Sequence, residues 1–477
     1  MLFRSGSPAV ASGDTTSAAG LPPLEGATLT VEVTREARLV GWGRTAALTL
    51  TEGEAEARVF ITGTDDANWL TPLAEGVARP GLVALGDGAF LLAGGYGNDR
   101  SSLPARAQDA MFRLDLATPA DPVGFVAAGT LPAYLSEAGE TQTKRGDATW
   151  NVLEAQGPDQ GKVLVVGGGA GLPWERATTI SGSVELYDPA ADDGTGLPGA
   201  WSNLGSLTQG RAQHVAQETT LGNVVVWGGF GSTDRDGVYG WNPSLEVYRR
   251  TQQAFSEVED LPDVVPGSVA PGIASLGEQG VLICGGAEYA SSSAWGASAG
   301  CLRVSADGSS VSAFAELPQP LAAPAMVTLP DGRVFLSGGT IVRGPVDNDE
   351  MSAATNATWI WDGTSWTNGG RMQIERLGHS MTVLPDGKVL IVGGTAEWSP
   401  TELPGTSYAC VEIYDPAEGT FRLLDACDAT SDSAGLPGRT AFPAVATDAA
   451  RGTLVVGGIG PSGAQTGVSL YLSSAVE

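Results

Sequence analysis

Short apolar runs recur along most of the chain, and seven of them end in a pair of glycines. A short, continuous aliphatic run between turn signals is typical of a strand that is buried on both faces. The glycine pairs lie 73, 61, 57, 53, 55 and 64 residues apart, which predicts a repeat architecture with connections of variable length. The runs read LLAGG, VLVVGG, VVVWGG, VLICGG, VFLSGG, VLIVGG and LVVGG, with glycines at 94–95, 167–168, 228–229, 285–286, 338–339, 393–394 and 457–458.

Each repeat is predicted to hold four strands. A turn signal such as Asp87-Gly88 precedes the glycine-pair run, and another strand-like segment precedes the turn, which indicates a hairpin. A polar loop follows the glycines, and then come a third strand-like run and a fourth run marked by an aromatic residue. With 67 glycines, 29 prolines and only 17% charged residues, the composition also favours many turns and few helices. The fourth-run aromatic residues are Phe125, Trp201, Phe255, Phe314, Trp366 and Phe421.

The seventh repeat lacks a fourth strand, because the chain ends at Glu477, soon after the third-strand residue Tyr471. A spare copy lies at the other end of the chain. The segment NWLTPL around Trp69 precedes the first repeat and, like the segment around Trp201, leads through an arginine into the next first strand. If this N-terminal strand completes the last sheet, seven sheets close into a ring and the unpaired edge of an open array is protected.

Together these features resemble the kelch-type β-propeller, whose repeats span about 50 residues. The resemblance implies an all-β, seven-bladed propeller over residues 63–477, closed by an N-terminal strand, in which the glycine pairs let neighbouring sheets approach closely. Residues 1–26 are small, polar and rich in proline and glycine, so we expect a disordered leader or linker there. Residues 27–62 are strand-like without a glycine pair, so we expect a short extra β segment.

The four cysteines form two pairs, each separated by 17 residues. Cys410 and Cys427 lie symmetrically about the turn between a third and a fourth strand. Cys284 and Cys301 lie symmetrically about the loop between a second and a third strand. Residues at mirror positions of a hairpin face each other, which predicts two disulfides, with four buried thiols as the alternative. The chain has no C-x-x-C motif, which argues against a zinc site.

The predicted disulfides indicate an oxidising compartment, so we expect an exported protein of the cell envelope or the extracellular space. No signal sequence is visible in this chain, and we expect no transmembrane segment, since no apolar stretch is long enough to span a bilayer as a helix. The formal charge of −28, from 54 acidic and 26 basic residues, disfavours binding to nucleic acid. We expect a monomer without cofactors.

Few residues of this chain could supply catalytic chemistry. Propellers of this type include copper radical oxidases resembling galactose oxidase, whose site needs two imidazoles, tyrosine ligands and a cysteine cross-linked to a tyrosine. The two histidines, His214 and His379, precede a first strand at the same repeat position, and we interpret both as structural. The G-x-S-x-G string at 296–300 joins two strands and not a strand and a helix, so we interpret it as coincidental. We therefore predict no catalytic residues and no metal site.

Ligand-binding residues are predicted on the long loops between second and third strands. In a four-stranded antiparallel sheet, these loops and the connections to the next sheet emerge on the same side of the ring. Rigid aromatic side chains and arginines held on a scaffold give contact area at low entropic cost. The predicted ligand-binding residues are Trp174, Arg176, Arg235, Tyr239, Trp241, Tyr289, Trp295, Arg343 and Trp398, and the same loops also carry Tyr96, Phe230 and Arg100.

The function predicted from these observations is non-catalytic recognition of a protein or a glycan through the long loops. Two alternatives stay open. One is a carbohydrate-active enzyme, a sugar mutarotase or an oxidase-like protein, with a polar site at the centre of the ring. The other is a structural surface module in which the loops merely pack. Fold alone does not choose among them.

Overall fold

The computed structural model describes the strand backbone at 24–27, 30–35, 38–44, 48–50 and 62–63, and then residues 67–98, 104–117, 123–136, 139–170, 180–192, 194, 198–231, 240–291, 294–341, 346–347, 352–398, 406–424, 427 and 436–473. Only the backbone is described at 67, 104–106, 240–241, 289–291, 294–295, 346–347, 352 and 398. Across these ranges the regular structure consists of strands and one 3-10 turn at Gly277–Gln279. The predicted all-β fold class is confirmed.

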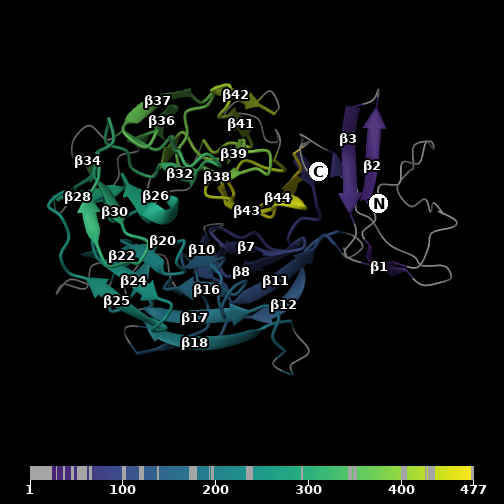
Figure 1. Cartoon of the computed structure of the whole chain (residues 1–477), viewed down its shortest axis with the longest axis horizontal. Coiled ribbons are helices and arrows are strands. Elements are labelled where there is room, and N and C mark those ends of the chain that lie inside the picture. Colours follow the sequence, from purple (N-terminus) through teal and green to yellow (C-terminus); the bar gives the residue numbers. More distant parts are fainter. Residues whose placement is uncertain are drawn as a thin grey trace.

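Seven four-stranded antiparallel sheets, the blades, surround a common centre in the described part of the chain (Figure 1). Each blade's first strand contacts the first strands of both neighbouring blades, which closes the ring. From first to fourth strand, blade 1 is β7 (Gly81–Gly86), β8 (Ala89–Ala93), β11 (Ala110–Asp115) and β12 (Val126–Thr130); blade 2 is β15 (Thr149–Val152), β16 (Val163–Val166), β17 (Ser183–Asp188) and β18 (Ala200–Ser206); blade 3 is β20 (Val215–Glu218), β21 (Val224–Trp227), β24 (Leu245–Arg249) and β25 (Ala254–Val258); and blade 4 is β26 (Gly272–Ser275), β27 (Val281–Cys284), β30 (Cys301–Val304) and β31 (Val311–Ala313). Blade 5 is β32 (Ala325–Thr328), β33 (Val334–Ser337), β36 (Ala357–Trp361) and β37 (Trp366–Arg371); blade 6 is β38 (Ser380–Val383), β39 (Val389–Val392), β41 (Val411–Asp415) and β42 (Thr420–Leu423); and blade 7 is β43 (Ala444–Asp448), β44 (Gly452–Val456), β47 (Val468–Tyr471) and β6 (Ala67–Trp69).

The N-terminal strand completes the last blade, as predicted. β6 pairs antiparallel with β47, and the N–H of Leu70 donates to the carbonyl of Val468 at 3.0 Å. The register differs in one respect from that of blades 2, 3, 5 and 6. Third-strand and fourth-strand aromatic residues lie opposite each other in blade 2, where Tyr187 pairs with Trp201, but Trp69 lies opposite Ser469 and is 57% exposed. Trp69 therefore does not take the place of the usual fourth-strand aromatic residue.

Each glycine pair connects its blade to the next through a backbone hydrogen bond. The N–H of the second glycine donates to the carbonyl of the residue four positions before the next first strand, over N···O distances of 2.6–3.0 Å. Both glycines of every pair have φ between 61° and 101°, and a Cβ on the first would lie 2.1–2.6 Å from the same carbonyl oxygen. Only glycine fits both positions. The bonds run from Gly95 to Arg145, Gly168 to Arg211, Gly229 to Ser268, Gly286 to Leu321, Gly339 to Arg376, Gly394 to Thr440 and Gly458 to Val77.

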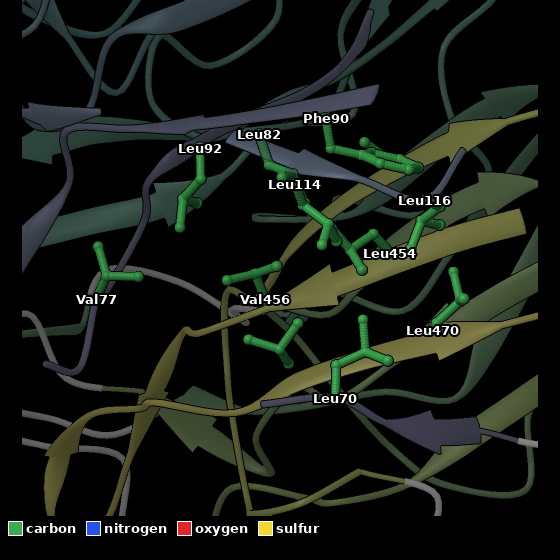
Figure 2. Close-up of a cluster of buried hydrophobic side chains, with 12 residues drawn as sticks. Leu70, Val77, Leu82, Phe90, Leu92, Leu114, Leu116, Leu454, Val456 and Leu470 are labelled. Carbon is green, nitrogen blue, oxygen red and sulfur yellow. The ribbon is translucent and has the colours of Figure 1, made fainter. Parts of the chain in front are cut away.

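The hydrophobic core lies between the blades. On β16, Val163 and Val165 pack toward blade 1, whereas Leu164 and Val166 pack toward blade 3. Second strands are continuously apolar because both of their faces are buried in this way. At the closure of the ring, residues from blade 1 and blade 7 interdigitate with Leu70, which follows β6 (Figure 2).

Buried ion pairs tie three of the inter-blade connections to their own blades. Each pair joins the arginine whose carbonyl accepts the glycine bond to a glutamate on the third strand, and no side chain involved is more than 3% exposed. Loss of one partner of such a buried pair costs about 3–5 kcal/mol. The pairs are Arg145–Glu185 at 2.5 Å, Arg211–Glu246 at 2.5 Å and Arg376–Glu412 at 2.9 Å.

Both predicted disulfides are present. Cys284 and Cys301 are register partners on β27 and β30, with a Cα–Cα distance of 4.2 Å. Cys410 directly precedes β41, and its partner Cys427 follows β42, with a Cα–Cα distance of 5.7 Å. Each bond therefore joins two neighbouring strands of a blade at the ends from which the long loops emerge.

Ahead of the propeller, β2 (Thr30–Arg35), β3 (Arg38–Arg44) and β5 (Thr62–Gly63) form one small sheet, and β1 (Leu24–Ala27) pairs with β4 (Leu48–Leu50). These strands fall in and next to the predicted extra β segment, whose status as a unit of its own stays a prediction. The expected leader before residue 24 lies outside the described residues. No helix in the part of the chain described here is long and apolar enough to cross a membrane.

Ring closure predicts a contrast between two adjacent residues. Leu70 is 8% exposed and packs in the cluster between blades 7 and 1, whereas its neighbour Trp69 is 57% exposed. Leu70→Ala should lower the free energy of unfolding by about 2–5 kcal/mol, because it leaves a cavity at the closure. Trp69→Ala should change it by no more than about 0.5 kcal/mol, although tryptophan is the larger residue. Urea denaturation followed by fluorescence and circular dichroism measures both, and equal effects would contradict the assigned closure.

Candidate functional site

The long loops and the connections between blades meet on one side of the ring, as predicted. The residue after each glycine pair is bridged to a residue three positions before the first strand of its own blade, as Tyr96 is to Ala78 and Thr395 is to Leu377. We call this side the long-loop face. Its loops are long enough to form small sheets of their own, so they are partly ordered before any ligand arrives.

Four predicted binding residues lie on strands of this face. Tyr289 on β28 (Ala287–Ser291) is the register partner of Trp295 on β29 (Ala294–Ala297). Trp241 on β23 (Gly240–Trp241) pairs with Phe230, and Trp398 on β40 (Glu397–Trp398) pairs with Ser352. The other five lie outside the described residues, namely Trp174, Arg176, Arg235, Tyr239 and Arg343.

Neighbouring long loops are joined to one another. β34 (Val346–Asp347) in the loop of blade 5 pairs with β29 in the loop of blade 4, and β35 (Ser352–Ala353) pairs with β40 in the loop of blade 6. Across blades 7 and 1, the N–H of Ala464 donates to Oδ1 of Asn98 at 2.6 Å. The loops therefore form linked groups, which limits their independent motion.

At the centre of the face, each blade contributes one residue with a left-handed backbone. These seven residues, the mouth ring, lie two positions before each first strand and have φ between 48° and 58°. Six of them are not glycine, and such conformations cost about 1–3 kcal/mol each and cluster at functional sites. Backbone bonds join ring neighbours, as from Phe442 N–H to the Gly378 carbonyl at 2.6 Å. The members are Arg79, Asp147, Gln213, Ala270, Ala323, Gly378 and Phe442.

The ring has a polar half with one buried carboxylate at its hub. Asp147 accepts hydrogen bonds from Arg79 Nη1 at 3.3 Å, from the Tyr96 hydroxyl at 3.1 Å and from Gln213 Nε2 at 3.1 Å. The guanidinium carbon of Arg79 lies 4.4 Å from the ring centroid of Phe442. The cluster joins blades 7, 1, 2 and 3.

Tyr96 does not occupy the place that the loop pattern suggested. It lies on a long loop, but it is 1% exposed and points its hydroxyl to Asp147. Burial, followed by the charge of Asp147, raises the pKa of Tyr96 well above its usual value, so the phenol stays protonated and remains a donor. Tyr96 is a support of the mouth ring, and not part of an exposed binding surface.

The other half of the ring carries Ala270, Ala323 and Gly378, and a cavity of about 290 Å³ lies next to it. The cavity is lined by β26, β32, β38 and β43 and by the residues just before them. Within the described residues, each of these innermost strands pairs with another strand along one edge only, which leaves backbone N–H and C=O groups of the other edge for side chains, water or a ligand.

Both histidines serve as buried repeat residues next to the mouth ring. His379 Nε2 lies 2.8 Å from the hydroxyl of Ser337, and His214 Nε2 lies 3.0 Å from that of Thr149. Burial, followed by a neighbouring arginine, lowers the pKa of each to about 3. Repeat alignment could have located the mouth ring, since Arg79 and Asp147 share one repeat position. The contact between the side chains of Arg79 and Asp147 depends on the curvature of the ring.

The other residues that could supply chemistry have structural roles or lie apart from one another. Ser298, in the G-x-S-x-G string, is 7% exposed and its hydroxyl contacts the carbonyl of Val265 and the N–H of Gly300. Among the described residues, no group of three or more His, Cys, Asp or Glu side chains is arranged to hold a metal ion.

Comparison with known proteins shows a likeness of fold. No family model matches the chain, and no curated protein matches it. One similar solved structure is described as a novel fungal alcohol oxidase with catalytic diversity among the AA5 family, in complex with copper. It is 16% identical to this chain, with a TM-score of 0.55, and the alignment covers 85% of this chain and 76% of the oxidase chain. A second solved structure, that of YjhT, is 14% identical in sequence to this chain, with a TM-score of 0.48, and the alignment covers 74% of this chain and 99% of the YjhT chain. The predicted seven-bladed propeller of the kelch type is confirmed as the fold.

The buried histidines predict a pH dependence of stability. In the unfolded chain they titrate near pH 6.5, whereas in the folded protein they stay neutral down to about pH 3. Below pH 6.5 the unfolded state therefore binds more protons, and the free energy of unfolding falls as the pH is lowered, by about 2 kcal/mol per histidine at pH 5. The equivalent residue in blade 2 is Ala148, so the double variant His214→Ala, His379→Ala should fold.

In urea unfolding at pH 7 and pH 5, this double variant should lose less stability on acidification than the wild type. Carboxylates titrate alike in both proteins and cancel in the comparison. An identical loss in the two proteins would contradict the burial of neutral imidazoles.

Proposed function

We propose that this protein is a binding module that recognises a protein or a glycan through its long-loop face. The observation that carries the proposal is the gathering of aromatic loop positions on one side of a closed ring. Trp241, Tyr289, Trp295 and Trp398 all lie on short strands of this side. Scaffold-held aromatic residues are the typical anchors of recognition surfaces.

Preorganisation supports binding over simple packing. Pairing of β29 with β34 and of β35 with β40 links three loops, and the Cys284–Cys301 disulfide fixes both ends of the loop that carries Tyr289 and Trp295. A surface ordered before the encounter loses less conformational entropy on binding. The charge of −28 favours basic ligands at long range and disfavours nucleic acid.

A second candidate is a carbohydrate-active enzyme with its site at the ring centre. The polar half of the mouth ring favours it, since Arg79, Asp147 and Gln213 meet there. Against it, the Asp147 carboxylate already accepts three hydrogen bonds, and its side chain is only 4% exposed.

We also propose that the protein is exported to the cell envelope or the extracellular space. Two disulfides support this, since such bonds persist in oxidising compartments. Intact mass measured on protein from its native compartment, with thiols blocked at lysis, should be about 4 Da below the fully reduced mass, one hydrogen lost per cysteine. Four blocked thiols would contradict export.

The loop-face proposal predicts the effect of removing its aromatic residues. The quadruple variant Trp174→Ala, Trp241→Ala, Trp295→Ala, Trp398→Ala should lose at least tenfold in affinity for ligands found by glycan array or pull-down, because the anchors are gone. Trp69→Ala is the matched control, since Trp69 is 57% exposed on the outer strand of blade 7. Titration calorimetry measures both.

Binding that survives in the quadruple variant would reject the loop-face proposal. Conversion of a sugar ligand, followed by proton NMR and abolished by Asp147→Asn, would support the enzyme instead. Intact folding of every variant is checked by circular dichroism.

A further inference from the structure

The guanidinium of Arg79 is fixed from two sides at the mouth ring. Nη1 donates to Asp147 Oδ1 at 3.3 Å, and the guanidinium carbon lies 4.4 Å from the ring centroid of Phe442. Asp147 is held in turn by Tyr96 and Gln213, so neither partner of the ion pair is free to reorient. An arginine held in this way is prepared for a ligand, because little rotamer freedom remains to be lost.

Most donors of this guanidinium are unused. A guanidinium carries five N–H groups, and Asp147 takes one of them. Nε is buried and has no hydrogen-bond partner among the described residues. The donors left for an incoming group belong to the part of the side chain that is exposed, which is 15% of it.

The exposed end of the ion pair is the positive one. The side chain of Arg79 is 15% exposed, whereas that of Asp147 is 4% exposed and already accepts three hydrogen bonds. A group that approaches this ion pair from the mouth therefore meets the guanidinium before the carboxylate. A planar carboxylate matches the fork of a guanidinium better than any other common acceptor.

Space for the rest of such a ligand lies on the opposite side of the ring. Ala270 and Ala323 project only a methyl group there, the ring of Phe442 lies over Gly378, and the cavity beside these residues measures about 290 Å³. This volume is at the lower end of the range for small-molecule sites. Free backbone edges of the innermost strands supply hydrogen bonds to a polar body.

We propose that the mouth of the propeller binds the carboxylate of a small organic acid, with Arg79 as the recognising group and the cavity holding the body of the molecule. The ligand enters through the long-loop face, and the inference goes beyond the proposed function, which concerns a protein or a glycan bound by the loops. It uses none of the predicted loop residues, and the two can be tested separately.

Titration calorimetry with two matched pairs of probes tests the proposal, namely benzoate against benzamide and gluconate against sorbitol. At about 0.15 M salt the Debye length is about 8 Å, which screens the long-range repulsion from a chain of charge −28. At least one carboxylate should bind tenfold or more tightly than its uncharged partner. Arg79→Gln should remove that preference, and Arg422→Gln should keep it, since Arg422 is exposed on the outer strand of blade 6.

A second variant keeps Arg79 and closes the entrance. Phe442 has φ 52° at the ring position where Ala323 has φ 51°, so Ala323→Phe should be accepted by the backbone. It should weaken carboxylate binding at least tenfold with unchanged circular dichroism. The quadruple tryptophan variant should bind the acid normally, which separates failure of this site from failure of the loop face.

The proposal is overturned if no carboxylate is preferred over its uncharged partner, or if Arg79→Gln binds the acid as Arg422→Gln does. Preference for a glutamate-containing peptide over both small acids, lost in Arg79→Gln, would overturn the small-molecule assignment in favour of a protein side chain.

Discussion

One backbone hydrogen bond, repeated seven times, holds this ring together. It runs from the second glycine of each pair to a carbonyl four residues before the next first strand, and the last copy joins Gly458 to Val77. A propeller whose final blade failed to reach its first would leave this donor and acceptor without partners. The steric demand is equally strict, since a Cβ on the first glycine would lie within 2.6 Å of the accepting oxygen at every blade. Side chains between blades can vary, but the distance between backbones at this point cannot.

Three consecutive residues of each connection perform three tasks. The first, at Arg145 in blade 2, accepts the glycine bond with its carbonyl, and its guanidinium pairs with Glu185 inside the blade. The next, Gly146, is bridged to the start of the long loop at Gly169. The third, Asp147, turns left-handed into the mouth ring. Scaffold, loop anchor and central site are thus set by one short segment, so any change in blade spacing would move all three.

The long loops can therefore differ from blade to blade without a change in the blades themselves. Loops of very different length leave the ring at fixed points, and their mutual pairing gives them order without altering the blades. The mouth ring breaks the sevenfold symmetry in a different way. Its backbone repeats at all seven positions, but three neighbouring blades contribute arginine, aspartate and glutamine, and three others contribute alanine, alanine and glycine. A symmetric frame therefore carries an asymmetric centre, with donors on one side and space on the other.

The sequence alone determined the architecture, because each structural constraint of a blade recurs along the chain as a repeated pattern of residue types. Glycine pairs, apolar second strands and the spare N-terminal strand specified seven closed blades, and mirror spacing specified both disulfides. The reason is that backbone approach and two-sided burial restrict residue type wherever they occur. The mouth ring escaped notice because left-handed backbone at Arg79 or Gln213 has no such restriction and is imposed by the neighbouring blades. The loop pattern suggested that Tyr96 is an exposed aromatic residue, but Tyr96 is buried and contacts Asp147 of the next blade. Contacts between side chains on different blades depend on the curvature of the ring, which only the tertiary structure supplies.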